Sequence, residues 1–215
     1  VMRGKKSERE KFAGAVDSYT IEAMMGNGWA LQSATSHFLG QNFGRAFDIK
    51  FLNQSNELDY AWTTSWGLST RMVGAIIMAH GDDQGLMLPP RLAPFQAVVV
   101  PIWRKDAEQA AVLEMGRRVA DTLKAAGVRV KLDTRDELSA GFKFNDWEMR
   151  GVPLRIEIGP RDVEQNAVVF ARRDVPGKEG KTFGVPVDGV AQATRDMLDT
   201  IQAGMLARAT KFQVA

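Results

Sequence analysis

A single arginine stands at the start of an apolar run within the stretch Ser65–Pro90, where it could bind an anion. Arg71 follows Gly67, a residue at which the backbone can closely approach another molecule. The apolar run has the character of a helix, so the guanidinium projects from the start of that helix. Its planar fork suits a carboxylate or a phosphate. The simpler alternative is that Arg71 pairs with a neighbouring carboxylate of the chain.

A second group of candidate residues lies between Gln32 and Gln41, a segment rich in small and polar side chains. His37 is one of two histidines in the chain, and a lone histidine more often has a structural than a catalytic role. Gln32 and Thr35 offer hydrogen-bonding side chains in the same segment. Trp66 could form an apolar wall of a ligand pocket or simply pack in the core.

The second half of the chain combines cations with aromatic side chains, as RNA-binding surfaces do. Unpaired bases stack on aromatic rings and are recognised at their edges, while phosphate contacts fix position. The candidate residues for such contacts are Lys143, Trp147, Glu148, Arg150, Arg155 and Glu157. A structural alternative applies to each, since Arg155 and Glu157 share one face of a strand and can pair with each other. The net charge of +2 is too small to indicate RNA binding by itself.

Several antiparallel strands that feed into one helix are predicted for the first half of the chain. Residues 29–43, 46–51 and 60–66 have the alternation of half-buried strands. The helix begins near Arg71 and ends in the Gly-Asp-Asp-Gln-Gly turn at residues 81–85. We expect the polar and charged residues 1–11 to be exposed and poorly ordered.

Three titratable residues near the end of this helix are assigned to no site. His80 is expected to act as a favourable cation at the helix C-terminus rather than in catalysis. Asp82 and Asp83 stand in a Gly-flanked turn and are expected to be solvent-exposed, so no protein metal site is predicted.

The proline-rich stretch 88–94 is the predicted domain boundary, because prolines restrict the backbone to an extended connector. We therefore divide the chain into domains 1–90 and 91–215. Alternating strands and helices in the second domain indicate a partly parallel sheet with right-handed crossovers. Its strands are expected at 96–102, 128–133, 153–158, 167–172 and 181–185, and its helices at 106–126, with Asp106 as the cap, 137–149 and 187–209.

The composition is that of an ordinary globular chain. The 215 residues are 45% hydrophobic and 25% charged, and no apolar stretch is long enough to span a membrane. No apolar core follows the charged N-terminal residues, so a signal peptide is not expected. The lack of cysteine excludes disulfides, thiolate metal ligands and thiol nucleophiles, and it fits a cytoplasmic location.

The stretch SWGLSTRMVGAIIMAHGDDQGLMLPPRLAP closely resembles motif 3 of class II aminoacyl-tRNA synthetases, and specifically prolyl-tRNA synthetases of the archaeal and eukaryote-like type. In that motif an arginine at a helix start binds the γ-phosphate of ATP, and the resemblance gives this catalytic role to Arg71. The segment TSHFLGQNF is similar to a signature of the same family. It implies that Gln32 and Thr35 bind the nucleotide and that His37 lies at the proline pocket. The resemblance further places at that pocket Ser65, Trp66 and Gly67.

The second half resembles the anticodon-binding domain shared by prolyl-, threonyl-, glycyl- and histidyl-tRNA synthetases, most clearly in GFKFNDWEMRGVPLRIEIGPRD. The resemblance implies an α/β (α+β) chain, in which the end of an antiparallel class II catalytic sheet precedes a mixed-sheet anticodon-binding domain. It also implies that Glu148 or Glu157 could accept hydrogen bonds from guanine, because proline anticodons end in two guanines.

The reaction implied by the resemblance is that of a proline–tRNA ligase, which uses ATP and Mg²⁺, binds proline and tRNA(Pro), and forms a homodimer as the full-length enzyme. Proline's carboxylate attacks the α-phosphate of ATP, and the prolyl group then passes to the terminal ribose of the tRNA. Such transfer relies on positioning and on cations that meet phosphate charge. Motifs 1 and 2 of the family would lie upstream of Phe12, and the usual C-terminal extension is missing. We therefore expect adenylation by this polypeptide alone to be absent or very weak.

Two other classes of function remain open. A non-catalytic tRNA-binding accessory protein derived from a class II synthetase would bind the anticodon without ATP-dependent exchange. Threonyl-tRNA synthetase is the nearest alternative enzyme, but that family uses a zinc site with Cys and His, and no cysteine is present here.

Overall fold

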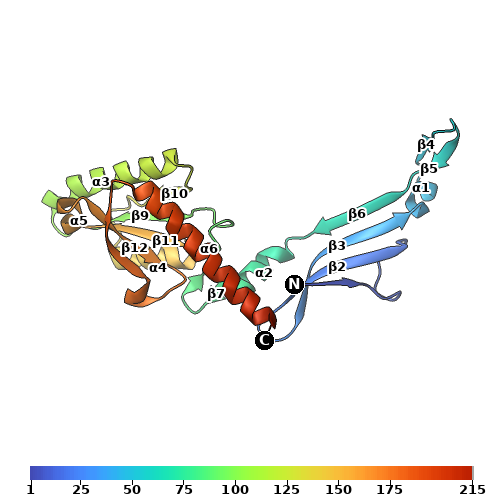
Figure 1. Ribbon diagram of the computed structural model, residues 1–215, viewed down its shortest axis with the longest axis horizontal. Coiled ribbons are helices and arrows are strands. Elements are labelled where there is room, and N and C mark those ends of the chain that lie inside the picture. Colours follow the sequence, from blue (N-terminus) through green and yellow to red (C-terminus); the bar gives the residue numbers. More distant parts are fainter. Residues whose placement is uncertain (215) are drawn as a thin grey trace. The chain divides into compact units, whose positions relative to one another are not determined.

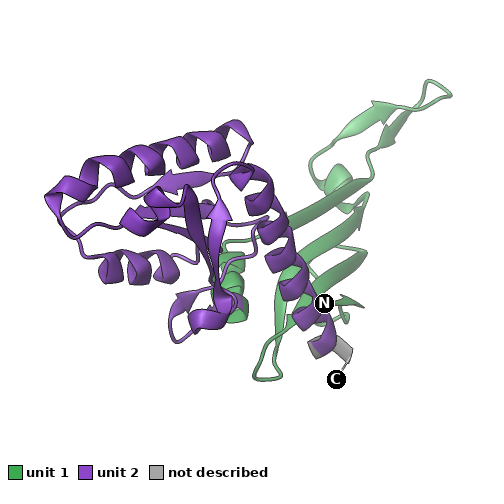
Figure 2. Ribbon diagram, turned by 60° about the vertical axis from the view of Figure 1, so that its left-hand side comes forward, with its two compact units in different colours: residues 1–79 green, residues 80–215 purple. Residues whose placement is uncertain are grey.

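The computed structural model describes residues 1–214 (Figure 1), and the chain forms two compact units, Val1–Ala79 (unit 1) and His80–Ala215 (unit 2) (Figure 2). The proline-rich stretch predicts a later domain boundary, at residue 90. The residues between these two positions pack on unit 2. Leu88 donates its N–H to the carbonyl of Gly151 (3.2 Å), and the Asp82 carboxylate accepts two hydrogen bonds from Arg173. Because of these contacts, the proline-rich stretch 88–94 lies within unit 2 and not at its boundary.

Unit 1 is built on a four-stranded antiparallel sheet in the order β1-β2-β3-β6 (Figure 1). Its strands are β1 (Met2–Lys5), β2 (Asp17–Met24), β3 (Ala30–Gly40) and β6 (Thr63–Leu68). The antiparallel sheet predicted for the first half is therefore confirmed. The expectation of a poorly ordered start is wrong for residues 2–5, because they pair with β2.

A short helix and a separate hairpin interrupt the pattern predicted between residues 43 and 66. Helix α1 (Asn42–Ala46) precedes a two-stranded pair formed by β4 (Lys50–Leu52) and β5 (Leu58–Tyr60). The prediction of a half-buried strand over 46–51 is wrong, because the strand begins at Lys50 and all its residues are exposed. Between the end of β5 and the start of β6, the chain passes close to α1. A Cβ on Gly44 would lie only 2.5 Å from the carbonyl oxygen of Ala61.

Helix α2 (Arg71–His80) follows β6, as the sequence predicts. The Ser69 hydroxyl accepts the backbone N–H of Arg71 (3.3 Å) and satisfies one of the free donors at the helix start. Burial lowers the pKa of His80, the last residue of the helix, so its imidazole is neutral near pH 7. The cation expected at this helix C-terminus is therefore not formed at neutral pH.

Unit 2 contains a five-stranded mixed sheet in the order β10-β9-β11-β12-β13. The two neighbours of β9 run parallel to it, whereas β12 and β13 continue the sheet in antiparallel fashion. The strands are β9 (Ala97–Pro101), β10 (Val130–Leu132), β11 (Leu154–Ile158), β12 (Ala167–Arg172) and β13 (Lys181–Pro186). The predicted mixed, partly parallel sheet is confirmed.

Helices cover both faces of the unit 2 sheet. One face packs against α3 (Asp106–Ala125), α5 (Pro160–Glu164) and α6 (Val190–Val214), and the other against α4 (Ala140–Met149). Side chains alternate along β9, so Ala97 and Val99 enter the larger core, whereas Val98 and Val100 pack with Trp147 of α4. The sheet is buried on both faces, as expected for parallel strands joined by helices.

A few local features differ from the sequence expectation. The sequence does not predict α5, the 3₁₀ turn η1 (Gly177–Gly180) or the small hairpin of β7 (Gly81–Asp82) and β8 (Gly85–Leu86). Asp106 is the first residue of α3 rather than its cap. The carboxylate of Glu108 instead accepts the backbone N–H groups of Arg104 and Lys105 (3.2 and 3.3 Å). Within residues 1–214, no helix has the length and apolar character needed to cross a membrane.

Candidate functional site

One face of the unit 1 sheet collects polar side chains from three strands into two rows. Directly paired residues of antiparallel strands place their side chains on the same face. The first row joins Thr20, Thr35 and Gly67, and the second joins Ser18, His37 and Ser65. We call this surface the polar sheet face. It brings together four of the residues that the sequence analysis assigns to nucleotide or proline.

His37 is held in a fixed orientation on the polar sheet face. Its Nδ1 lies 2.7 Å from the hydroxyl of Ser18, a fully buried side chain that also accepts the N–H of Phe12 (3.3 Å). The ring of Phe12 lies against the imidazole, with 5.0 Å between the ring centroids. No described residue forms a hydrogen bond with Nε2, which therefore remains available to a ligand.

Arg71 lies at the end of the same sheet, where α2 begins. The residue is exposed, and its Nη1 donates to the backbone carbonyl of Gln32 (3.3 Å). Within the described part of the chain, the guanidinium forms no ion pair with a carboxylate, so the structural alternative for Arg71 is not realised. A guanidinium held by one carbonyl keeps most of its donors for an anionic ligand.

Lys6 is a cation at this face that the sequence analysis missed. Its Nζ donates to Oε1 of Gln32 (3.3 Å), and its backbone N–H continues the pairing of β1 by donating to the Ser18 carbonyl (2.9 Å). Only strand pairing brings this residue to the polar sheet face. No local signal in the charged N-terminal segment could have indicated it.

Glu22 supplies the one carboxylate that β2, β3 and β6 place on the polar sheet face. It pairs across the strands with Gln32, and its Oε1 accepts the hydroxyl of Thr20 (3.3 Å). A Mg²⁺ ion bound to substrate phosphates takes one or two protein carboxylates and keeps several waters. This face fits such an ion, although the described residues contain no group of three or more side chains that could hold a metal by themselves.

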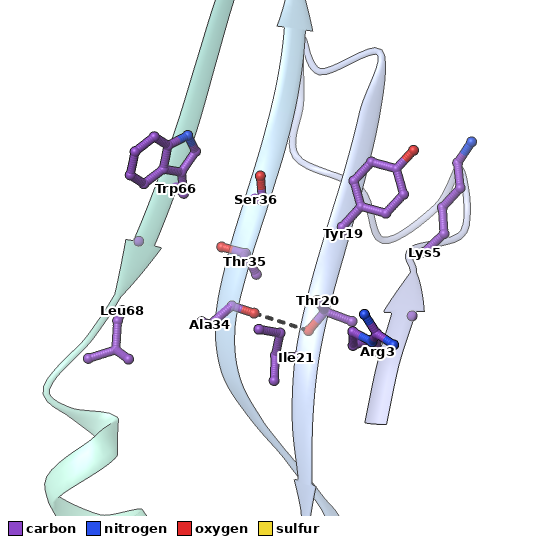
Figure 3. A pocket seen from close by; sticks show the side chains of 12 residues that line it. Arg3, Lys5, Tyr19, Thr20, Ile21, Ala34, Thr35, Ser36, Trp66 and Leu68 are labelled. Atoms are coloured by element: carbon purple, nitrogen blue, oxygen red, sulfur yellow. Dashed lines mark hydrogen bonds between the residues drawn. The ribbon is translucent and has the colours of Figure 1, made fainter. Parts of the chain in front are cut away.

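Trp66 lies on the opposite side of the sheet from the other proposed proline contacts. It pairs with Ser36, the neighbour of His37, and successive residues of a strand point to opposite faces. Trp66 is 76% exposed. Figure 3 shows its indole on β6, with Ser36 on β3 and Tyr19 on β2. The structure therefore does not bring Trp66 into one pocket with His37 and Ser65, although the hollow that it lines also includes Gly67. Trp66 is not packed in the core of unit 1 either, so the alternative of core packing is also not realised.

Trp147 is a core residue of unit 2 rather than an exposed surface for base stacking. It is 5% exposed, and its indole N–H donates to Oδ2 of Asp133 (2.8 Å). Arg135 binds both oxygens of Asp133 (2.9 and 2.7 Å). Burial by itself would raise the pKa of Asp133, but the hydrogen bonds from Arg135 and Trp147 outweigh it and lower the pKa to about 2. The ionised carboxylate thus fixes α4 on the sheet.

Arg155, Glu148 and Glu157 belong to one ion network within unit 2. Arg155 donates to Glu148 (2.7 Å) and to Glu157 (3.0 Å), and Lys181 donates to Glu157 (2.8 Å). The side chains of Arg155 and Glu157 are 13% and 10% exposed. The ion pair between Arg155 and Glu157, which is the structural alternative to RNA contact for these two residues, is therefore present. Lys181 is a fourth member that the sequence analysis did not single out.

Lys143 and Arg150 differ strongly in their access to solvent. Lys143 is 3% exposed, and its ammonium lies 5.4 Å from the ring centroid of Trp103. The side chain of Arg150 is 57% exposed. The well exposed aromatic rings of unit 2 are those of Phe142 and Phe183, at 56% and 67%, among the residues that the structure describes. Of the six proposed anticodon contacts, Arg150 is thus the one that solvent reaches freely.

Comparison with known proteins finds relatives for both units. The profile of a family described as an anticodon binding domain matches residues 96–196. Proline–tRNA ligase of Roseiflexus sp. (strain RS-1) is 56% identical over 213 residues, which cover 99% of this chain and 44% of that protein. Proline–tRNA ligase, chloroplastic/mitochondrial, of Arabidopsis thaliana is 55% identical and is covered over 40% of its length.

A solved structure shares the fold over nearly the whole chain. Prolyl-tRNA synthetase from Cryptosporidium parvum, complexed with L-proline and AMP, is 40% identical with a TM-score of 0.88. The match covers 98% of this chain and 44% of that one. The chain therefore spans less than half the length of these relatives.

Proposed function

Because this chain belongs to the prolyl-tRNA synthetase family and spans about 44% of the length of its relatives, we propose that it forms part of a proline–tRNA ligase. Such an enzyme activates proline with ATP and transfers it to tRNA(Pro). The observation that carries the proposal is the polar sheet face, which collects Thr35, His37, Ser65 and Gly67. The family resemblance inferred from motif 3 and from the anticodon-binding half is confirmed by the matches.

In this proposal ATP binds at the Arg71 end of the polar sheet face. Arg71 contacts the γ-phosphate, and Gln32 and Thr35 hold the nucleotide. The role of Arg71 is supported by its exposed guanidinium, which retains donors for phosphate oxygens. Lys6 adds positive charge beside Gln32. A Mg²⁺ ion held by the phosphates and Glu22 would neutralise phosphate charge.

Proline occupies the neighbouring part of the same face, against His37, Ser65 and Gly67. The strand is open there, since a Cβ added at Gly67 would meet no atom within 4 Å. The proline carboxylate attacks the α-phosphate and pyrophosphate leaves, which gives prolyl-adenylate. A ribose hydroxyl of the tRNA then attacks the prolyl carbonyl, and AMP leaves. No side chain acts as a nucleophile, so the contribution of this chain is positioning and charge stabilisation.

Unit 2 binds the anticodon in this proposal. Arg150 supplies an accessible cation, and Phe142 supplies an accessible ring for base stacking. Glu148 and Arg155 are half-buried, and the Glu148 carboxylate could accept hydrogen bonds from a guanine edge. The remaining candidates act from inside the unit by holding these groups in place: Lys143, Trp147 and Glu157.

The full-length ligase is proposed to be a homodimer in the cytoplasm. Sedimentation of the full-length enzyme tests the first statement. Cell fractionation tests the cytoplasmic location. This test is needed because the Arabidopsis relative is named as chloroplastic/mitochondrial.

Proline-dependent ATP–pyrophosphate exchange tests the proposed function. The chain is assayed alone and together with a separate polypeptide that contains the part of the Roseiflexus sp. ligase that the chain does not cover. Exchange only in the mixture is expected. Absence of exchange in a mixture whose two parts bind each other would refute the proposal.

A non-catalytic tRNA-binding protein is the second candidate function. The observation that favours it is that unit 2, which contains the residues matched by the anticodon binding domain, has two core clusters of its own. Tight binding to tRNA(Pro) by the chain alone, with no exchange in the mixture, would support this function instead.

A further inference from the structure

Ser18 places a buried hydroxyl against the imidazole of His37. The two residues pair directly across β2 and β3, and Ser18 is fully buried. Its Oγ lies 2.7 Å from Nδ1 of His37 and accepts the backbone N–H of Phe12 (3.3 Å). Because a backbone amide can only donate, the Ser18 oxygen already serves as an acceptor, and its own proton still needs a partner.

The proton of the Ser18 hydroxyl has one acceptor within reach. Among the hydrogen bonds formed by residues 1–214, the one to Nδ1 of His37 is the only one that can take it. The separation of 2.7 Å is typical of a hydroxyl donor and is shorter than the about 2.9–3.0 Å of most N–H donors. Both observations indicate that Ser18 donates and that Nδ1 accepts.

This direction of donation determines where His37 carries its own proton. A neutral imidazole is protonated at one ring nitrogen and accepts at the other. If Nδ1 were protonated, in the other tautomer or in the imidazolium, the buried proton of Ser18 would have no acceptor. A buried donor without a partner is costly, because it has lost its hydrogen bonds to water. The pair therefore favours the tautomer with the proton on Nε2, which no described residue binds.

The Nε2–H group gives His37 a definite polarity toward a ligand. Proline offers a carboxylate, whose oxygens only accept hydrogen bonds, and a protonated imino nitrogen, which only donates them. A donor on His37 can therefore bind a carboxylate oxygen but not the imino nitrogen, and hydrogen bonds to a charged acceptor are the stronger kind. The ring of Phe12 packs against the imidazole, with 5.0 Å between the centroids, and helps to fix the direction of the Nε2–H group.

We propose that Ser18 is a positioning residue of the substrate site: its hydroxyl holds His37 as the Nε2–H tautomer, and His37 thereby donates a hydrogen bond to a carboxylate oxygen of proline. The inference rests on the proposed function, because that function places proline at His37. Ser18 itself touches no substrate, since it is buried beneath the polar sheet face. The inference also states which group of proline His37 contacts.

Nitrogen NMR of the imidazole rings in the 215-residue chain measures the tautomer directly. The chain contains two histidines, so His80→Gln leaves only the signals of His37, and His37→Gln identifies those of His80. Spectra are recorded at about pH 8.5, where histidine is ordinarily neutral. We expect one form of His37, with its proton on Nε2 and a bare Nδ1 that accepts a hydrogen bond. A proton on Nδ1, or an equal mixture of the two tautomers, would overturn the proposal.

Three substitutions test whether the Ser18 hydroxyl is the cause. Ser18→Ala removes the donor at nearly unchanged volume and should shift the ratio of the two tautomers toward Nδ1–H by about fivefold, the effect of one lost hydrogen bond. Ser18→Thr retains a hydroxyl and should keep the wild-type spectrum. Ser36→Ala is the matched control, since Ser36 is the neighbour of His37 in β3 but is exposed on the other face. An unchanged spectrum for Ser18→Ala, or an equal change for Ser36→Ala, would contradict the role of Ser18.

Proline binding provides the functional measurement. In the pyrophosphate exchange mixture described above, Ser18→Ala should raise the KM for proline about fivefold and leave the KM for ATP unchanged, while Ser18→Thr should keep both at the wild-type values. In a His37→Ala background, Ser18→Ala should have no further effect, because the hydroxyl acts only through His37. Equal effects in the two backgrounds would show that Ser18 supports the fold rather than His37, and would overturn the proposal.

The spectra require no catalysis, so a failure of this inference can be distinguished from a failure of the proposed function. Proline-dependent exchange by a protein with the His37 proton on Nδ1 would refute the inference and support the ligase activity. The Nε2–H tautomer in a mixture that shows no exchange would refute the ligase activity and the contact with proline, while the effect of Ser18 on His37 would stand.

Discussion

Replacing Asp133 with Asn is expected to destabilise unit 2 by an amount that depends on pH. The Asp133 carboxylate is 2% exposed and accepts hydrogen bonds from the Arg135 guanidinium and from the indole of Trp147. An amide of the same shape loses the negative charge and one acceptor, while Arg135 keeps its ion pair with Asp146 (2.8 Å). The expected loss comes from the hydrogen bonds of the Trp147 indole and the Arg135 guanidinium, because bonds to an ionised acceptor are stronger than bonds to a neutral one.

The size of the effect follows from the pKa of this carboxyl. A value of about 2 in the folded chain, against 3.8 in the unfolded one, corresponds to about 2 kcal/mol of stability at neutral pH. Because the folded pKa is the lower one, this contribution is complete above the unfolded value and is lost as the pH falls through the folded value. It should be nearly constant between about pH 7 and pH 5, and about 1 kcal/mol of it should be lost by about pH 3.

Native-state hydrogen exchange of the β9 amides measures the opening free energy of unit 2 specifically. The wild type and Asp133→Asn are compared at neutral pH and at about pH 3, where the difference between them should shrink. Asp121→Asn is the matched control, since its native side chain is 73% exposed and pairs with Lys124 at the surface. No difference at neutral pH, or a difference that is equally large in acid, would show that the Asp133 carboxylate does not stabilise unit 2.

Three further substitutions test other parts of the structure. Gly85→Ala should cost more than about 2 kcal/mol in urea unfolding, because its φ is +128° and a Cβ would lie 2.5 Å from the Met149 Cα. Gly141→Ala on α4 meets nothing within 4 Å and should be neutral or stabilising, so similar losses for both would contradict the packing. In the assembly with the Roseiflexus partner, Arg71→Lys should reduce proline-dependent exchange by about tenfold or more, because Lys lacks the planar fork; the exposed Arg91→Lys is the control, and equal rates for the two would argue against the phosphate contact. Arg150→Gln should weaken tRNA(Pro) binding and reduce its salt dependence with no change in unfolding, whereas Trp147→Phe should cost about 1–3 kcal/mol by removing the indole donor to Asp133. Filter binding and urea unfolding measure the two effects, and the opposite pattern would contradict both roles.

Much of unit 2 could be predicted from local patterns. The apolar periodicity of α3 and the hydrophobic run of β9 determine the type of each element without long-range information. Unit 1 shows where local patterns fail. The residues of β1 have no strand signal of their own, and they are ordered only because they pair with β2. Residues 46–51 alternate like a strand, but the chain there passes from α1 into an exposed hairpin.

The candidate site could be predicted in part. Motif resemblance indicated Thr35, His37 and Gly67, and strand pairing places all three on one face. The same alternation rule separates Trp66 from Gly67, its neighbour in the strand, and it could have been applied to the sequence. The burial of Trp147 could not have been foreseen, because its partner Asp133 approaches only through the packing of α4 on the sheet.

The most direct test of the polar sheet face uses a chimera in which this chain replaces the matching 213-residue part of the Roseiflexus sp. ligase. Thr35→Val removes a hydroxyl from the polar face, and Thr64→Val removes one from the other side of the same sheet, since Thr64 pairs with Phe38. We expect proline-dependent pyrophosphate exchange by the chimera, a loss of about tenfold for Thr35→Val and little change for Thr64→Val. A folded but inactive chimera, or equal losses for the two variants, would contradict it.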